Sequence, residues 1–186
     1  MPRIRRFLQC IFVWGVPQAK GDLHEAQVIL TQAMCNLSDG SASKTNMLLA
    51  KCVRKNYIVL GAPVFPQGEL AQAIERQQVP IIGQTRILQS SGVFEEGYFD
   101  TYSVALEHKK FCDQMGWKRV VLVSFVPHIW RAKWVYEKLG FEVIIPGEMP
   151  KMVFQKDLAQ RHWRRDLTGY AYEFLARLYY LWKGYI

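Results

Sequence analysis

With 186 residues, half of them hydrophobic and 22% charged, the chain has the length of one domain and is too apolar to be an intrinsically disordered protein. Its 24 Lys and Arg residues outnumber its 16 Asp and Glu residues, and the resulting net charge of +8 favours anionic partners. The basic residues are spread along the chain without a nucleic-acid-binding motif, so we do not expect nucleic acid among these partners.

An apolar run over residues 7–17 follows the basic start of the chain and is interrupted by Gln9. The run is well short of the roughly 20 apolar residues of a membrane-spanning helix, and it lacks the small-residue cleavage site of a signal peptide. The sequence therefore predicts a cytoplasmic protein with no transmembrane segment, although this basic and apolar start could touch a membrane surface.

The first third of the chain alternates strand and helix patterns. Residues 26–32 (AQVILTQ) are apolar and β-branched, as in a buried strand, and a turn dipeptide at 39–40 follows them. Residues 43–54 place apolar side chains at helical spacing, and residues 57–60 (YIVL) predict a second strand that stops at a glycine.

The middle of the chain continues this alternation. Residues 68–77 predict a helix, in which Glu69 is an exposed charge that suits the positive end of the helix dipole. Residues 79–88 predict one or two short strands, interrupted by Gly83. Residues 119–124 (RVVLVS) predict a strand apolar enough to be covered on both faces, which is typical of a parallel sheet.

Three further helices are predicted. Asp100 suits the N-cap of a helix that ends at Gly116, and His108 falls on its apolar face, where a core histidine is expected. Pro127 suits the first turn of the next helix, and a strand over 141–145 (FEVII) follows that helix. The last helix spans residues 167–182 and is amphipathic. Its predicted core face consists of Tyr170, Ala171, Phe174, Leu175, Leu178, Tyr179 and Trp182.

Strands that alternate with helices through short loops predict an α/β fold, a Rossmann-like open parallel sheet with flanking helices and a C-terminal amphipathic helix. No repeat or linker divides the chain, so residues 1–186 are predicted to form a single domain. In such sheets ligands bind outside the carboxyl ends of the strands, near the point where the strand order reverses.

The segment from Ser124 to Ala132 is the strongest candidate for a binding site, because it leaves a buried strand and opens a helix. Free backbone N–H groups at the start of that helix favour an anion, and the planar fork of Arg131 suits a carboxylate or phosphate. His128 could donate a proton, act as a nucleophile or only hydrogen-bond a ligand. Alternatively, His128 caps local backbone while Arg131 forms an ion pair on the surface.

Other candidates lie at turns and strand ends. Asp100 and Thr101 stand at a strand-to-helix junction, where the alternative role is helix capping. The predicted ligand-binding residues are Asp39, Gly40, Gly61, Ala62, Asp100, Thr101, Ser124, His128 and Arg131, with His128 as the catalytic candidate. No metal site is predicted, although Asp39, Glu69 and Asp100 could converge in space. The single cysteines Cys10, Cys35, Cys52 and Cys112 indicate buried free thiols.

The order of these segments resembles the DUF218 family, which includes proteins of the YdcF, SanA and ElyC types. Residues 124–143 (SFVPHIWRAKWVYEKLGFEV) are similar to the family block in which a strand leads through TS-x-x-H-x-x-R-A into a helix and a glycine. Residues 99–107 (FDTYSVALE) are similar to its S-x-[ND]-T-x-E-N-A block, and residues 173–185 look like the helix that closes many members. With weaker matches in the first two strands, the resemblance covers about residues 26–186.

The resemblance implies a Rossmann-like fold and a crevice lined by Asp100, Thr101, Ser124, His128 and Arg131. It also suggests a nucleotide-like ligand or S-adenosylmethionine, although the chain has no glycine-rich cofactor loop. The chain departs from the family pattern after the first two predicted strands, where family members carry glycine pairs, and after Thr101, where they carry Glu-Asn.

Three functions follow as hypotheses. The first is a domain that binds a small anionic ligand, phosphate-bearing or nucleotide-like, through Arg131 and helix amides, with His128 and Thr101 as orienting groups. The second is a phosphate-ester hydrolase or transferase in which His128 acts as general acid or nucleophile. The third is a non-catalytic interaction protein with a vestigial crevice.

Overall fold

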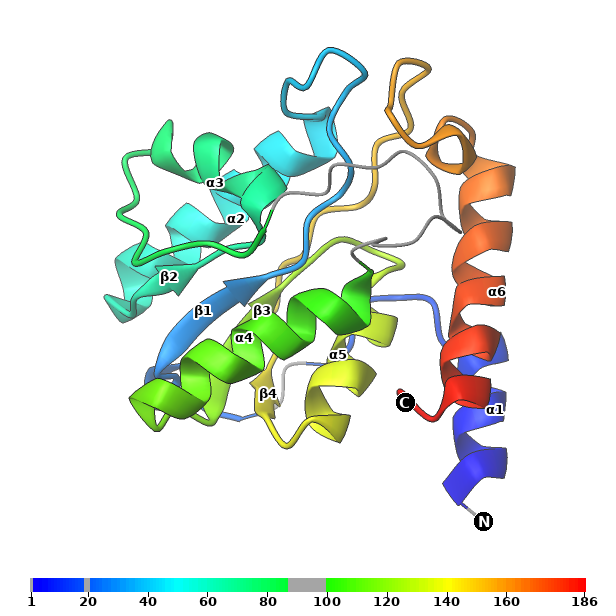
Figure 1. Cartoon of the computed structure of the whole chain (residues 1–186), viewed down its shortest axis with the longest axis horizontal. Helices are drawn as coiled ribbons and strands as arrows, with labels where there is room; N and C mark the ends of the chain where they lie inside the picture. The colour runs from blue at the N-terminus through cyan, green and yellow to red at the C-terminus, as the bar shows by residue number, and fades with distance from the viewer. Residues whose placement is uncertain (1, 19–20, 87–99) are drawn as a thin grey trace.

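Four parallel strands form the central sheet in a computed structural model that describes residues 2–18, 21–86 and 100–186 (Figure 1). The strands are β1 (Val28–Thr31), β2 (Val64–Phe65), β3 (Arg119–Val123) and β4 (Glu142–Ile144). Their order is β2-β1-β3-β4, and Leu30 of β1 pairs with Leu122 of β3 at the centre. The fold is therefore α/β and Rossmann-like, as the sequence predicts.

The helices of the described residues are α1 (Pro2–Phe12), α2 (Lys44–Leu60), α3 (Gly68–Glu75), α4 (Thr101–Met115), α5 (Ile129–Lys138) and α6 (Asp166–Lys183), with 3-10 turns η1 (Leu23–Glu25) and η2 (Arg161–Trp163). Helices α2 to α5 cover the two faces of the sheet, and α1 and α6 lie together at one margin of the molecule (Figure 1). One core joins α2 and α3 to strand residues such as Ile29 and Val121, and the other joins α4 and α5 to their neighbours Leu30 and Leu122. Successive strand residues thus point into opposite cores, because side chains alternate between the two faces of a strand.

The connections create a switch point between β1 and β3. From β1 the chain passes through α2 to β2 on one side, and from β3 it passes through α5 to β4 on the other side. Where the connections from two neighbouring parallel strands run to opposite sides, a crevice forms beyond the carboxyl ends of these strands. The position predicted for a ligand crevice is therefore at the carboxyl ends of β1 and β3.

The prediction of a strand at residues 57–60 is wrong, because these residues form the last turn of α2. No helix breaker precedes Gly61, which adopts a left-handed conformation (φ +61°) and ends the helix with its N–H bonded to the Tyr57 carbonyl. Ile58 and Val59 point to solvent. The second strand is the short β2, so Gly61 precedes it and lies at its amino end, away from the predicted crevice.

The predicted strands over 79–88 are also wrong within the described residues. Ile81 forms only an isolated parallel bridge to Val64 in residues 79–86, and residues 87–88 lie outside the described part of the chain. Gly83 adopts φ +148° and packs against the ring of Phe65, so the backbone turns away from the sheet edge.

Helix α6 is present as predicted, but it faces the opposite way. The predicted core face is exposed at Tyr170, Leu175, Tyr179 and Trp182, while the buried residues are Gly169, Glu173, Arg177 and Tyr180. Hydrophobic periodicity predicts the helix correctly but assigns its buried face wrongly, because the pattern gives no sign that Glu173 and Arg177 form a buried ion pair. No helix in the described residues is long and apolar enough to cross a membrane.

Replacement of Gly169 by alanine should destabilise the protein, although alanine is the better helix former. An added Cβ would lie 2.8 Å from Cε1 of Phe154 and 2.9 Å from Cε3 of the buried Trp163. We expect Gly169→Ala to lower the free energy of unfolding in urea by about 1–3 kcal/mol. Gly147→Ala, which meets no atom within 4 Å, is the matched control. A more stable Gly169→Ala would show that α6 does not pack as described.

Candidate functional site

The carboxyl ends of β1 and β3 are fastened together by Gln32 and Ser124. The Gln32 N–H donates to the Val123 carbonyl at 3.0 Å, and the Ser124 hydroxyl donates to the Gln32 carbonyl at 3.1 Å. The Gln32 side chain amide donates to the Thr101 carbonyl (3.2 Å) and to the Tyr136 hydroxyl (3.0 Å). Gln32 and Ser124 are buried, so this end of the sheet is held in place from three elements.

A cavity of about 60 Å³ lies beyond these strand ends. Its polar lining comprises Gln32, Gln67, Glu69, Asp100, Thr101, His128, Arg131, Gln160 and Tyr172. Since a water molecule needs about 10–15 Å³ by this measure, the cavity holds only about four to six waters. A phosphate- or carboxylate-sized group suits this space.

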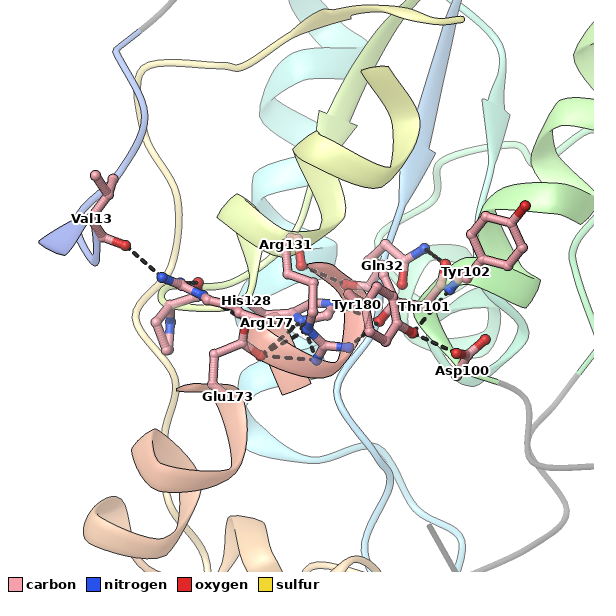
Figure 2. A network of polar contacts seen from close by, with 12 residues as sticks. Val13, Gln32, Asp100, Thr101, Tyr102, His128, Arg131, Glu173, Arg177 and Tyr180 are labelled. Atoms are coloured by element: carbon pink, nitrogen blue, oxygen red, sulfur yellow. Dashed lines mark hydrogen bonds and ion pairs between the residues drawn. The ribbon is translucent and has the colours of Figure 1, made fainter. Parts of the chain in front are cut away.

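One carboxylate, that of Glu173 in α6, lies between two guanidinium groups (Figure 2). Arg131 donates from Nη2 to Oε2 at 2.9 Å and lies with Nε 3.3 Å from both oxygens, while Arg177 donates from Nε to Oε1 at 3.1 Å. All three side chains are buried. Burial alone would raise the pKa of Glu173, but the Arg131 charge outweighs it and holds this pKa well below its usual range.

The network carries an excess positive charge. Arg177 satisfies its remaining N–H groups with carbonyls, donating from Nη1 to Val13 at 2.6 Å and from Nη2 to Pro127 at 2.7 Å. Arg131 donates from Nη1 to the Thr101 hydroxyl at 3.0 Å. Two guanidinium groups therefore surround one carboxylate, and only Arg131 of the two reaches the cavity wall.

His128 is held as a neutral ring. Its Nδ1 lies 3.1 Å from Nη2 of Arg131, a group that only donates, so Nδ1 accepts and Nε2 carries the proton towards the Thr101 hydroxyl at 3.5 Å. Glu173 Oε2 lies farther from Nδ1, at 3.4 Å. Burial and the Arg131 charge both lower the pKa of His128. In this tautomer the ring presents a hydrogen-bond donor to the Thr101 hydroxyl, and because it is neutral it is poorly suited to the general-acid role.

Helix α6 is also tied to α4 beside the cavity. The Tyr180 hydroxyl donates to Asp100 Oδ2 at 2.6 Å, and the Tyr180 ring lies 5.0 Å from the Cζ atom of Arg131. Asp100 Oδ1 accepts from the Ser103 N–H at 2.8 Å and caps α4 as predicted. Asp100 therefore both caps α4 and lines the cavity.

The structure brings together four of the predicted ligand-binding residues. Asp100, Thr101, His128 and Arg131 line the cavity. The alternative in which Arg131 forms an ion pair on the surface is wrong, because both Arg131 and Glu173 are buried.

Five predicted residues lie apart from the cavity lining. Asp39 and Gly40 form an exposed turn, where Asp39 accepts hydrogen bonds from Ser41. Gly61 and Ala62 precede β2 instead of following it. Ser124 is buried and bonds the end of β1. Asp39 therefore does not converge with Asp100, and the described residues contain no group of three metal-ligating side chains.

Sequence reasoning missed several residues of the site. Glu69 was expected on the surface, but it is buried and lines the cavity. Gln67 at the start of α3 accepts the Ala33 N–H at 2.8 Å and holds the loop after β1. The only available signal for Glu173 was its spacing of four residues from Arg177, which ordinarily indicates an exposed helix pair.

His108 and the cysteines are largely as predicted. His108 is buried in the core, where its Nδ1 contacts the Tyr136 hydroxyl, and burial lowers its pKa to about 3. The four cysteines are free, and all are buried except the half-buried Cys52.

Comparison with known proteins identified no matching family model, curated protein or solved structure. Membership of the DUF218 family therefore remains a prediction. A cavity of about 60 Å³ is too small to enclose a whole S-adenosylmethionine molecule, since ligands of that size occupy pockets of about 300–1,000 Å³.

Loss of the Glu173 charge should destabilise the fold strongly. In Glu173→Gln, two buried guanidinium groups would face each other without a carboxylate, at a cost of about 3–5 kcal/mol in the free energy of unfolding. Urea denaturation at neutral pH measures this cost. Glu148→Gln is the control, because Glu148 forms an exposed ion pair with Lys55. Equal stability of the two variants would contradict the buried network.

The buried histidines should make the protein less stable as the pH falls. Histidines in the unfolded chain titrate near pH 6.5, whereas His108 stays neutral in the folded state down to about pH 3. The unfolded state then binds the extra proton, so His108 alone should remove about 2 kcal/mol between pH 7 and pH 5. The lowered pKa of His128 acts in the same direction.

Urea denaturation at the two pH values tests this effect. His108→Gln should flatten the pH dependence by about 2 kcal/mol, and His24→Asn, at an exposed position, should retain it. An unchanged pH dependence in His108→Gln would show that folding does not lower the pKa of His108.

Proposed function

We propose that this protein binds the anionic group of a small ligand in the cavity beyond β1 and β3, with Arg131 as the principal contact. The observation that carries the proposal is the excess positive charge of the buried network, which reaches the cavity only at Arg131. An anion placed there would form charge-assisted hydrogen bonds to Arg131, and these must outweigh its repulsion from Glu69 and Asp100, which also line the cavity.

The surrounding helices support the same ligand class. Helices α3, α4 and α5 begin at Gly68, Thr101 and Ile129, and residues at or next to each of these starts line the cavity. The N-terminus of a helix carries a partial positive charge and N–H groups without helical partners. Asp100 already caps α4 and Glu69 lies in the first turn of α3, so the start of α5, which has neither a side-chain cap nor an acidic residue, is the one that adds to Arg131 in favouring a negative group.

Two acidic residues in the cavity lining narrow the range of suitable ligands further. Glu69 and Asp100 also line the cavity, so a bare anion would face two carboxylates as well as Arg131. A ligand that carries hydroxyl or amino groups next to its anionic group could donate to these carboxylates. We therefore favour a phosphate-bearing sugar or nucleotide-like ligand over inorganic phosphate, with only its anionic group inside the cavity.

A phosphate-ester hydrolase or transferase is the second candidate. The observation that favours it is the distance of 3.5 Å between His128 Nε2 and the Thr101 hydroxyl at the cavity wall. In this candidate Nε2 accepts a proton or attacks the phosphorus atom from the other neutral tautomer, in which Nδ1 carries the proton and donates it to Glu173 Oε2 at 3.4 Å, and the general-acid role is disfavoured by the lowered pKa of His128.

Thermal unfolding and calorimetric titration with inorganic phosphate, ribose 5-phosphate and adenosine monophosphate test the binding proposal. A ligand at a hundred times its dissociation constant adds about 2.7 kcal/mol of stability, or roughly 5–11 °C in Tm. Arg131→Lys keeps the charge but loses the planar fork, and we expect it to weaken binding by about tenfold or more.

Arg177→Lys is the comparison variant, since Arg177 bonds Glu173 without lining the cavity. We expect this variant to lose stability while its affinity changes far less than that of Arg131→Lys. An absence of binding to all three compounds by the folded wild-type protein would refute anion binding and favour a protein with a vestigial crevice. Release of phosphate that is lost in His128→Asn would favour the hydrolase.

A further inference from the structure

Helices α1 and α6 lie side by side along one margin of the molecule (Figure 1), and each of them exposes large apolar side chains. We call this surface the α1–α6 face, and define it by Ile4, Leu8, Phe12, Leu167, Leu175 and Trp182, all of which are exposed. Phe12 and Trp182 leave about three quarters of their surface in solvent, at 74% and 75%. A monomeric soluble protein rarely exposes so many large apolar side chains together, so this face indicates an interaction surface.

The α1–α6 face is part of a fixed structure. Arg177 of α6 donates to the Val13 carbonyl just after α1 at 2.6 Å, and the rings of Trp14 and Tyr170 meet edge to face at 5.8 Å. The inner side of α6 is occupied by the buried Glu173 and Arg177. The apolar residues of α6 therefore cannot turn inwards without breaking the ion network.

The exposed charges beside this face are mostly positive. Helix α1 has no acidic residue and exposes Arg5, whereas Arg6 is half-buried with its guanidinium 4.9 Å from the Trp134 ring centre. At the end of α6, the Lys183 ammonium lies 5.1 Å from the Trp182 ring centre. The acidic residues of the two helices are Asp166, at the start of α6, and the buried Glu173.

We propose that the α1–α6 face binds the surface of a membrane that contains anionic lipids. Amphipathic helices that lie in the lipid headgroup region combine apolar side chains, exposed aromatic rings and adjacent cations. The α1–α6 face has the same combination, with Tyr179 and Trp182 exposed beside Lys183. This function is separate from ligand binding in the cavity, because none of the residues that define the face lines it.

A second copy of the chain fits this face less well. A two-fold symmetric dimer brings the same patch of both subunits together, so its charges must be self-complementary. Arg5 and Lys183 beside the α1–α6 face outnumber its one exposed carboxylate, Asp166, so pairing of two copies would leave positive charge unmatched. An anionic lipid surface supplies the charges that the face lacks.

Sedimentation of the full chain with lipid vesicles tests the proposal. We expect binding to vesicles of phosphatidylcholine mixed with phosphatidylglycerol, weaker binding at high salt, and little binding to phosphatidylcholine alone. The double variant Leu175→Gln/Trp182→Gln should bind at least about tenfold more weakly, because each lost apolar side chain removes burial in the lipid. Arg5→Gln should bind about fivefold more weakly.

The control is Ile58→Gln/Val59→Gln, which alters two equally exposed apolar residues on α2 and should bind as the wild type does. Circular dichroism confirms that each variant is folded. Failure of the wild type to bind mixed vesicles, or equal loss in the α2 variant, would overturn the proposal. Sedimentation velocity that shows a dimer lost in Leu175→Gln/Trp182→Gln would assign the face to a second copy instead.

Discussion

The Glu173 carboxylate holds the outer part of this protein in place. It accepts hydrogen bonds from Arg131 in α5 and Arg177 in α6, and Arg177 in turn bonds the backbone at Val13 and Pro127. Two helices and the segment that follows α1 therefore meet at one buried charge. The position of α6 depends on an electrostatic contact, whereas α2 to α5 are held by apolar packing against the sheet.

This contact explains why α6 presents its apolar side to solvent. A helix normally turns its apolar stripe towards the core, because burial of apolar surface is the main driving force of folding. In α6 the side that faces the core carries Glu173, Arg177 and Tyr180, whose partners lie on other elements. Once these groups are paired, Leu175 and Trp182 must point outwards. The ion network and the exposed apolar face are thus two consequences of one arrangement.

Local signals predicted most of the fold. The strand at 119–123 and the cap at Asp100 depend on neighbouring residues and were predicted from them, and the helix predicted to have Pro127 in its first turn begins at Ile129. The strand predicted at residues 57–60 is wrong because the sequence YIVL, which is apolar and contains β-branched residues, suits a strand as well as a helix. Only the helical pattern that leads into these residues without a break favours a helix.

The site was only half predictable for a related reason. Asp100, Thr101, His128 and Arg131 stand at strand-to-helix junctions, which the order of elements already places at one edge of the sheet. Glu173 contacts Arg131 across 42 residues of sequence, and Gln32 contacts Tyr136 across 104. No local pattern encodes such pairs. Glu69 is buried because the loop after β1 closes over the start of α3, a tertiary effect that helix-end preferences do not contain.

The energetic cost of the network bears on its role. Transfer of three charged groups from water into the protein interior is expensive, and apolar residues of similar volume often stabilise a fold equally well or better. Stability alone therefore gives little reason for two buried guanidinium groups around one carboxylate. An arginine that is already oriented by Glu173 and Thr101 loses little freedom when an anion arrives, so the cost of ordering the site is met during folding. Preorganisation of Arg131 is the physical account that joins the buried network to the cavity beside it.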